Sequence, residues 1–293
     1  MRAARLIPFL LPFTVVLSPV AQAAWPEDVT PSSMLEHDGE AMLEPAVLGA
    51  TYEQLVKEVG TMVSNKAVLP AETLGANGWD YGFNMQWVFN EARDRAGEPS
   101  PWEMAHTSED SLPYQWIPSF SARKGLPLST EVGFTGGWIG MSQTGIVGGF
   151  GRIALLEGYK PWPNLSLHAG YSGYVGNREL QVGTMDMGVT LGGTYYTGAL
   201  PGVHTARISP WLDFSMLRVS SASKLDANTQ VALGAQTWQG GRAAASSGAN
   251  PPLTMTRFAG GWQVVSQNMH LRVGVSWAPA TIPVLNTGMG LTF

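Results

Sequence analysis

The stretch WDYGFNMQWVFN, residues 79–90, alternates between two kinds of side chain. Every odd position carries an aromatic residue or methionine, and nearly every even position carries a polar or small residue. On a helix the odd positions would spread around the whole cylinder, whereas on a strand they share one face. The pattern therefore predicts a β-strand with one strongly apolar face. Such a face suits either the core of a soluble sheet or the lipid side of a transmembrane barrel.

The composition favours the barrel. Charged residues make up 13% of the chain, about half of the roughly 25% that is typical of soluble domains. Glycine, at 35 residues, and tryptophan, at 11, are abundant, and the mean hydropathy is +0.01. Alternating lipid-facing and lumen-facing positions would produce this average. Cysteine is absent, which excludes disulfides, thiol chemistry and cysteine metal sites.

Residues 1–23 have the organisation of a secretory signal peptide. Arg2 and Arg5 precede an apolar core at residues 6–17 and a small-residue cleavage site at residues 21–23. Loss of the two arginines would change the formal net charge from -5 to -7, and this acidity argues against nucleic-acid binding. No later uninterrupted apolar run reaches the length of about 18 residues that a transmembrane helix needs.

The stretch VLNTGMGLTF, residues 284–293, also alternates and closes on Phe293. It resembles the C-terminal signal of Gram-negative outer-membrane β-barrel proteins, which typically end in a strand that closes on an aromatic residue. The resemblance covers ten residues. It implies an outer-membrane location, contact with outer-membrane lipid, and recognition of the Phe293 strand by the barrel-assembly machinery.

Residues 77–293 are predicted to form an all-β, antiparallel, up-and-down transmembrane barrel of about ten strands. The expected strands are 79–90, 112–122, 128–139, 144–157, 163–176, 178–196, 203–219, 253–266, 268–278 and 283–293. The long connections, 91–111 and 220–252, follow the first and seventh strands, so both fall outside the cell if the barrel begins in the periplasm. Residues 229–239 are another strand candidate, which leaves twelve strands as the alternative. A soluble β-sandwich is the competing fold.

Residues 24–76 are predicted to form a short N-terminal periplasmic segment with an amphipathic helix. The helix is expected to begin at Thr51, because Thr51 and Gln54 form a capping-box pair. One apolar stripe follows, formed by Tyr52, Leu55, Val56, Val59, Met62 and Val63. This stripe needs a partner surface. We expect the helix to pack on the periplasmic mouth, and a plug that enters the lumen is the alternative.

The same alternation predicts which charged residues face the lumen. They are Asp80, Glu131, Arg152, His168, Asp186, Arg207, Asp213, Arg257, His270 and Arg272. Leaving out the histidines, four acids face four arginines, as a buried salt-bridge network requires. Ten strands lie closer to the eight of a barrel filled by its own side chains than to the roughly sixteen of an open channel. The lumen is therefore expected to be narrow, gated or plugged.

Three functions follow from this interpretation. We favour an integral barrel with a structural role or one that passes a small-molecule ligand. The first alternative is an outer-membrane hydrolase, because a hairpin turn centred on Asn177 would set His168 opposite Asp186, where a carboxylate can orient an imidazole base. The second is a surface adhesion or recognition protein, with Trp102 and Trp238 of the outer loops as binding residues. No cofactor or metal is predicted, and an enzyme is the less favoured reading.

Overall fold

The computed structural model describes most of the chain. The predicted signal peptide, residues 1–23, lies outside the described residues. These are 27–35, 45–64, 69–90, 100–106, 113–158, 163–197, 206–239, 250–279 and 281–293.

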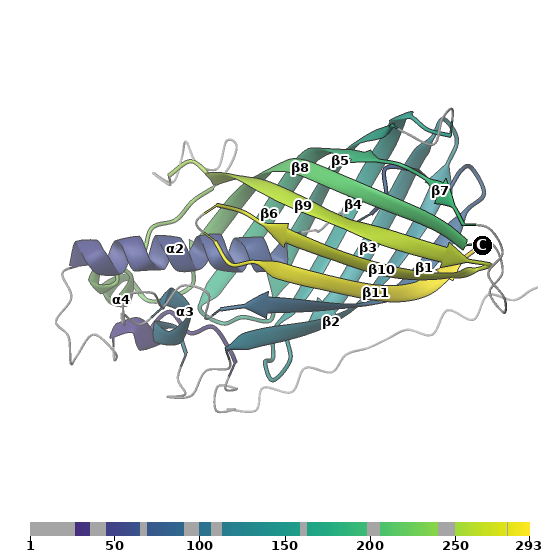
Figure 1. Cartoon of the computed structure of the whole chain (residues 1–293). Helices are drawn as coiled ribbons and strands as arrows, with labels where there is room; N and C mark the ends of the chain where they lie inside the picture. The colour runs from purple at the N-terminus through teal and green to yellow at the C-terminus, as the bar shows by residue number, and fades with distance from the viewer. Residues whose placement is uncertain are drawn as a thin grey trace, which may run out of the picture.

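Eleven strands form one antiparallel sheet (Figure 1). They are β1 (Trp79–Phe89), β2 (Tyr114–Leu126), β3 (Thr130–Trp138), β4 (Gly145–Leu156), β5 (Asn164–Val175), β6 (Leu180–Gly192), β7 (Tyr195–Tyr196), β8 (Ala206–Ser223), β9 (Leu253–Ser266), β10 (Met269–Trp277) and β11 (Val284–Thr292).

The sheet closes on itself, because β1 pairs with β11 and β6 pairs with β8. The short β7 continues the line of β6 after a two-residue interruption and pairs with Arg207 and Ile208 of β8. The wall therefore has ten strands, and the predicted number is confirmed. The twelve-strand alternative is wrong, since residues 229–239 contribute to helix α4 (Ala227–Ala232) and to two isolated bridges at Trp238, with Ser221 and Asn250.

The barrel turns its apolar side chains outward. Along β1, Tyr81 and Phe83 are exposed by 39% and 49%, whereas the intervening Asp80 is fully buried in the lumen. Other strands expose large apolar residues in the same way, among them Phe120, Phe134, Val147, Ile153, Leu167, Tyr171, Leu212, Phe214, Leu271, Val275 and Met289. A soluble sandwich would bury such residues, while a barrel in a bilayer turns them toward lipid. The competing soluble fold is therefore wrong.

The two ends of the barrel differ in their connections. At the terminal mouth, where β1 begins and β11 ends, Trp79 and Phe293 exchange two backbone hydrogen bonds of 2.8 and 2.9 Å. The turns there include the tight 127–129 and 267–268. At the opposite loop mouth lie the long connections 90–113 and 224–252. Both long connections thus share one mouth, as the strand count predicts.

Helix α2 (Pro45–Val63) enters the barrel from the loop mouth (Figure 1). Its last turns are buried on every side, from Glu58 to Ser64, and it packs against β5, β6 and β8. The predicted apolar stripe is buried, but the predicted start is wrong by six residues. Thr51 lies inside the helix, where its hydroxyl donates to the Val47 carbonyl at 2.9 Å instead of capping.

The chain then crosses the lumen. Residues 69–78 run from the end of α2 to the terminal mouth, where the Gly125 amide donates to the Gly78 carbonyl at 3.0 Å. The preferred prediction, a helix packed on the mouth beside the start of β1, is therefore wrong, and the plug alternative matches the structure. An amphipathic stripe specifies that a helix needs an apolar partner, but not at which mouth that partner lies.

A cap covers the loop mouth. We use this name for residues 27–35, the first half of α2, helix α3 (Pro101–Met104) and helix α4. The Thr30 amide donates to the Ala105 carbonyl at 2.7 Å, and the Ser32 amide donates to the Glu179 carboxylate at 2.9 Å. Residues 27–35 thus lie at the loop mouth, at the opposite end of the barrel from Trp79 and Phe293. Their predicted periplasmic location stays a prediction. The described helices include none that is long and apolar enough to span a membrane.

Candidate functional site: the plugged lumen

One wall of the lumen carries a cluster of charged residues centred on Arg123 of β2. Its guanidinium binds Asp80 of β1 at 2.9 and 3.1 Å and Glu131 of β3 at 3.1 Å. Arg152 of β4 holds the same Glu131 carboxylate at 3.0 Å, and Arg272 of β10 lies 3.8 Å from Asp80. All five side chains are almost completely buried. The strand register explains the cluster, because Asp80 pairs with Arg123 and Glu131 pairs with Arg152 directly across neighbouring strands.

A second cluster lies on β5, β6, β8 and β9. His168 is 3.7 Å from Asp186 and 3.4 Å from Asp213, and Arg257 is 3.7 Å from Asp186. Their side chains are at most 2% exposed. Buried charges of opposite sign placed this close stabilise a single arrangement of the lumen, because separating them would leave a charge without compensation.

Both clusters bind the N-terminal segment that fills the lumen. We call this segment the plug; its described residues are 58–64 and 69–78. Arg152 donates to the backbone carbonyls of Pro70 and Glu72, the latter at 2.7 Å. Arg257 donates to the Ser64 hydroxyl at 3.1 Å, just beyond the end of α2. The charged residues of the barrel wall therefore act as anchors for the segment that crosses the lumen.

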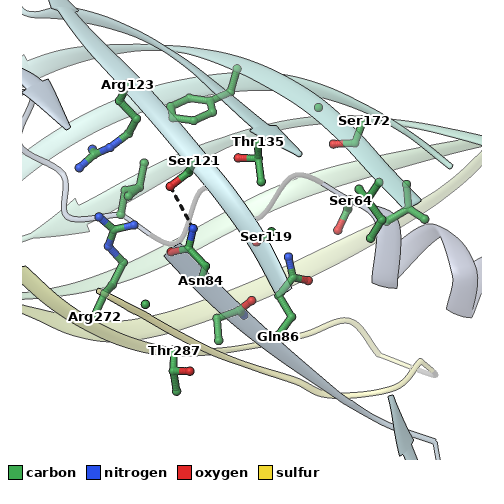
Figure 2. A pocket seen from close by; sticks show the side chains of 17 residues that line it. Ser64, Asn84, Gln86, Ser119, Ser121, Arg123, Thr135, Ser172, Arg272 and Thr287 are labelled. Carbon is green, nitrogen blue, oxygen red and sulfur yellow. Dashed lines mark hydrogen bonds between the residues drawn. The ribbon is translucent and has the colours of Figure 1, made fainter. Parts of the chain in front are cut away.

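Between the plug and the opposite wall the structure leaves a cavity of about 60 Å³ (Figure 2). Hydroxyl and amide groups of β1, β2, β3, β5 and β11 form much of its surface, namely Asn84, Gln86, Ser119, Ser121, Thr135, Ser172, Asn286 and Thr287. Asn84 donates to Ser121 at 2.9 Å, and Ser64 stands at the end of α2 (Figure 2). Arg123 and Arg272 lie together at one side. By volume, the space holds about four to six water-sized groups.

The hydrolase prediction placed His168 directly opposite Asp186, and this register is wrong by two residues. His168 pairs with Gly188, and Asp186 pairs with Gly170. The imidazole instead leans over Gly188, where a Cβ would lie 2.7 Å from His168 Cε1. The turn at Gly176, with φ of +91°, and Asn177 moves the centre of the hairpin. The two side chains still approach each other, but neither is exposed to solvent.

Arg207 belongs to neither cluster. It lies near the terminal mouth, where its side chain is 36% exposed and 3.6 Å from Glu72. Arg123 takes its place in the buried network, and the balance of four acids and four arginines is kept. The sequence prediction ended the second strand at residue 122, which assigned Arg123 to a turn. Alternation of Ile117, Ser119 and Ser121 on the buried face pointed to Arg123 as the next inward position.

Trp102 and Trp238 do not form an external binding surface as predicted. They are 1% and 3% exposed, and Trp238 stacks on Tyr52 of α2 with 6.0 Å between ring centroids. Trp102 packs beside His106, whose pKa is lowered chiefly by burial. Indole rings supply large apolar areas, so both tryptophans stabilise the cap.

Neither cluster has the composition of a metal centre. Within the described parts of the chain, no group of three or more histidine, aspartate or glutamate side chains is arranged to hold an ion. Each carboxylate of the two clusters is instead close to an arginine or histidine.

No protein-family model and no curated protein matches the chain. Several solved structures are similar to it. The transport unit of the Escherichia coli autotransporter AIDA-I is 9% identical, with a TM-score of 0.39, and the match covers 84% of this chain and 98% of that one. The translocator domain of Neisseria meningitidis NalP is 10% identical, with a TM-score of 0.33, and the match covers 90% of this chain and 98% of that one. The Acinetobacter baumannii outer membrane protein Omp33 is 10% identical, with a TM-score of 0.25, and the match covers 75% of this chain and 99% of that one.

These scores are too low to support an argument, and the class of protein follows from the barrel itself. A closed antiparallel barrel with an apolar exterior and a charged interior is the architecture of outer-membrane proteins. The chain is an integral β-barrel protein of an outer membrane.

Proposed function

We propose that this protein is a self-plugged outer-membrane barrel, in which passage of a small molecule requires movement of the N-terminal segment. The single observation that carries the proposal is the burial of α2 from Glu58 to Ser64 inside the lumen. Residues 69–78 continue this obstruction to the terminal mouth. On this view the loop mouth faces the cell exterior, since such barrels keep their long loops there.

The dimensions support closure. An α-helix with its side chains is about 10–12 Å wide, and a barrel of ten strands is only slightly wider than one that its own side chains fill. The backbone of α2 comes very close to β8 at Gly60, where a Cβ would lie 2.5 Å from a methyl carbon of Val219. Glycine at this position therefore lets the helix seat against the wall.

The anchors support a plug that stays in place at rest. Arg152 and Arg257 bind the segment at two depths, and the cap adds an apolar core around Tyr52, Leu55 and Trp238. Displacement of α2 would expose this core and leave two buried guanidinium groups with fewer acceptors, which is costly. Opening would therefore need a ligand or partner that binds the open form more tightly.

Current recordings in planar bilayers test the proposal. The full chain should give no steady conductance, and deletion of residues 27–72, which removes α2 and both backbone acceptors of Arg152, should give steady channels. The matched control is Glu53→Ala, which removes only a half-exposed ion pair with Lys57 on α2 and should remain closed. Heat-modifiable gel migration would establish that each barrel is folded.

Two results would overturn the proposal. One is a large steady current through the full chain, and the other is a folded deletion variant that remains closed. Gly60→Leu provides a second route if the deletion fails to assemble. Its side chain would push α2 away from Val219, so brief openings are expected, and a completely silent folded variant would contradict the plug mechanism.

Surface recognition is a second candidate function. The observation that favours it is the folded cap, which offers a defined outer surface on α2 and α4, including Val47 at 46% and Val231 at 79% exposure. If the cap recognises another cell or protein, deletion of residues 226–239 should abolish that binding while the barrel still assembles. A hydrolase that uses His168 and Asp186 would require substrate to reach fully buried side chains, and unchanged activity in His168→Ala would exclude it.

A further inference from the structure

The lumen cavity has an uneven distribution of charge. Of the described residues that line it, only Arg123 and Arg272 are charged, and none is an acid (Figure 2). The acidic residues of the second cluster, Asp186 and Asp213, lie on β6 and β8, the strands on which α2 packs. The cavity therefore faces the positive side of the lumen.

The positive side of the lumen is dense in arginines. Within ion-pair distance, Arg123, Arg152 and Arg272 share two carboxylates, those of Asp80 and Glu131. Arg152 also interacts with the carboxylates of Glu72 and Glu157. A buried arginine that has no carboxylate of its own is costly unless an opposite charge is nearby.

Arg272 is the arginine that is least well paired. Its Nε donates to Gln263 at 3.1 Å, and its Nη2 lies 3.2 Å from a His270 ring nitrogen and 3.8 Å from Asp80. The residues that the structure describes supply no acceptor for Nη1. Arg123, in contrast, uses all three of its guanidinium nitrogens on carboxylates.

Neutral polar groups of the same cavity also lack partners. Within the described part of the chain, Ser119 Oγ, Ser172 Oγ and Asn286 Nδ2 are buried without a hydrogen bond. The three residues are 3%, 1% and 7% exposed. Buried hydroxyl and amide groups normally have a partner, and each of these can donate a hydrogen bond.

We propose that this cavity is a binding site for a small monovalent anion, with Arg272 as its charged contact and the amide and hydroxyl groups as neutral donors. The volume of about 60 Å³ accommodates chloride, nitrate or a short carboxylate with some water. Water alone would satisfy the donors without compensating the charge. The inference goes beyond the proposed function, because an anion would bind in the closed barrel and its binding does not require the plug to move.

Chloride-35 NMR of the full chain in a neutral detergent tests the site. Exchange of chloride with the protein should broaden the resonance, and nitrate or acetate should remove the excess width by competition. Arg272→Gln should lose most of the excess width. Arg207→Gln is the matched control, since it removes an arginine near the terminal mouth and should leave the broadening unchanged. Potassium in place of sodium should have no effect.

Two results would overturn the proposal. One is a wild type in which nitrate or acetate removes no excess width of the chloride resonance. The other is a folded Arg272→Gln variant that keeps as much of this excess width as the wild type. Folding is checked by the boiling-dependent shift in gel migration. If Arg272→Gln does not assemble, Asn286→Leu keeps the charge and removes one donor. It should weaken chloride binding at least threefold, and unchanged binding would reject the assigned position.

Discussion

Replacing Arg123 by methionine should strongly destabilise the barrel. The methionine keeps much of the apolar stem but removes three hydrogen bonds of 2.9–3.1 Å to Asp80 and Glu131. Bonds to charged groups are worth about 1.5–3 kcal/mol each, but the two acids keep other partners, Arg152 on Glu131 and His270 on Asp80. Breaking a buried ion pair costs about 3–5 kcal/mol. We therefore expect a loss of about 3–5 kcal/mol in the free energy of unfolding.

Urea unfolding of the protein in lipid vesicles, followed by tryptophan fluorescence, measures this loss. Combining Arg123→Met with Asp80→Asn removes both partners, so the double variant should be more stable than the sum of the single losses by about 2 kcal/mol. Arg207→Met is the control and should lose at most about 1 kcal/mol, because this pair is partly exposed. Additive losses, or a loss below about 1 kcal/mol for Arg123→Met, would refute the assigned role of the network.

Three further predictions concern the cap and the sidedness of the chain. In a chain without native cysteine, Val47→Cys should react with an impermeant maleimide on intact cells and Leu128→Cys, in a turn of the terminal mouth, should not; the opposite pattern would reverse the orientation. Trp238→Ala should remove about 3–5 kcal/mol from the cap, seen as faster proteolysis of a barrel that still shifts on boiling; unchanged proteolysis would contradict this. Because burial lowers the pKa of His106, the unfolded chain takes up the proton first, so cap stability should be complete above about pH 6.5 and fall below it. Proteolysis of the cap should therefore become faster as the pH falls below about 6.5. His106→Asn should reduce this acceleration, and an equal acceleration in the variant would exclude His106 as its cause.

The strands were predictable because their signal is local. A side-chain period of two is written directly in stretches such as residues 79–90, and it separates lipid-facing from lumen-facing positions without knowledge of the partners. The same rule selected inward residues such as Asp80, Glu131 and Arg272, which the structure places in the buried network. Recognition of the strand that ends at Phe293 by the assembly machinery stays a prediction.

Errors arose where the outcome depends on a partner strand. Arg123 was missed because the end of β2 is set by its pairing with β1, which continues to Trp79 and Lys124. The relation between His168 and Asp186 depends on the geometry of one turn, and a shift of two residues turned a direct pair into a diagonal one.

The sequence by itself determined the class of fold and most of the charged residues that face the lumen, because alternation and turn residues act within a few neighbouring positions. Only the tertiary structure decided where the amphipathic helix lies. Its stripe matches any apolar surface, and the choice of the loop mouth depends on contacts between residues far apart in the chain, such as Tyr52 with Trp238 and Gly60 with Val219. The burial of Trp102 and Trp238, and the cavity left beside the plug, follow from that same long-range packing.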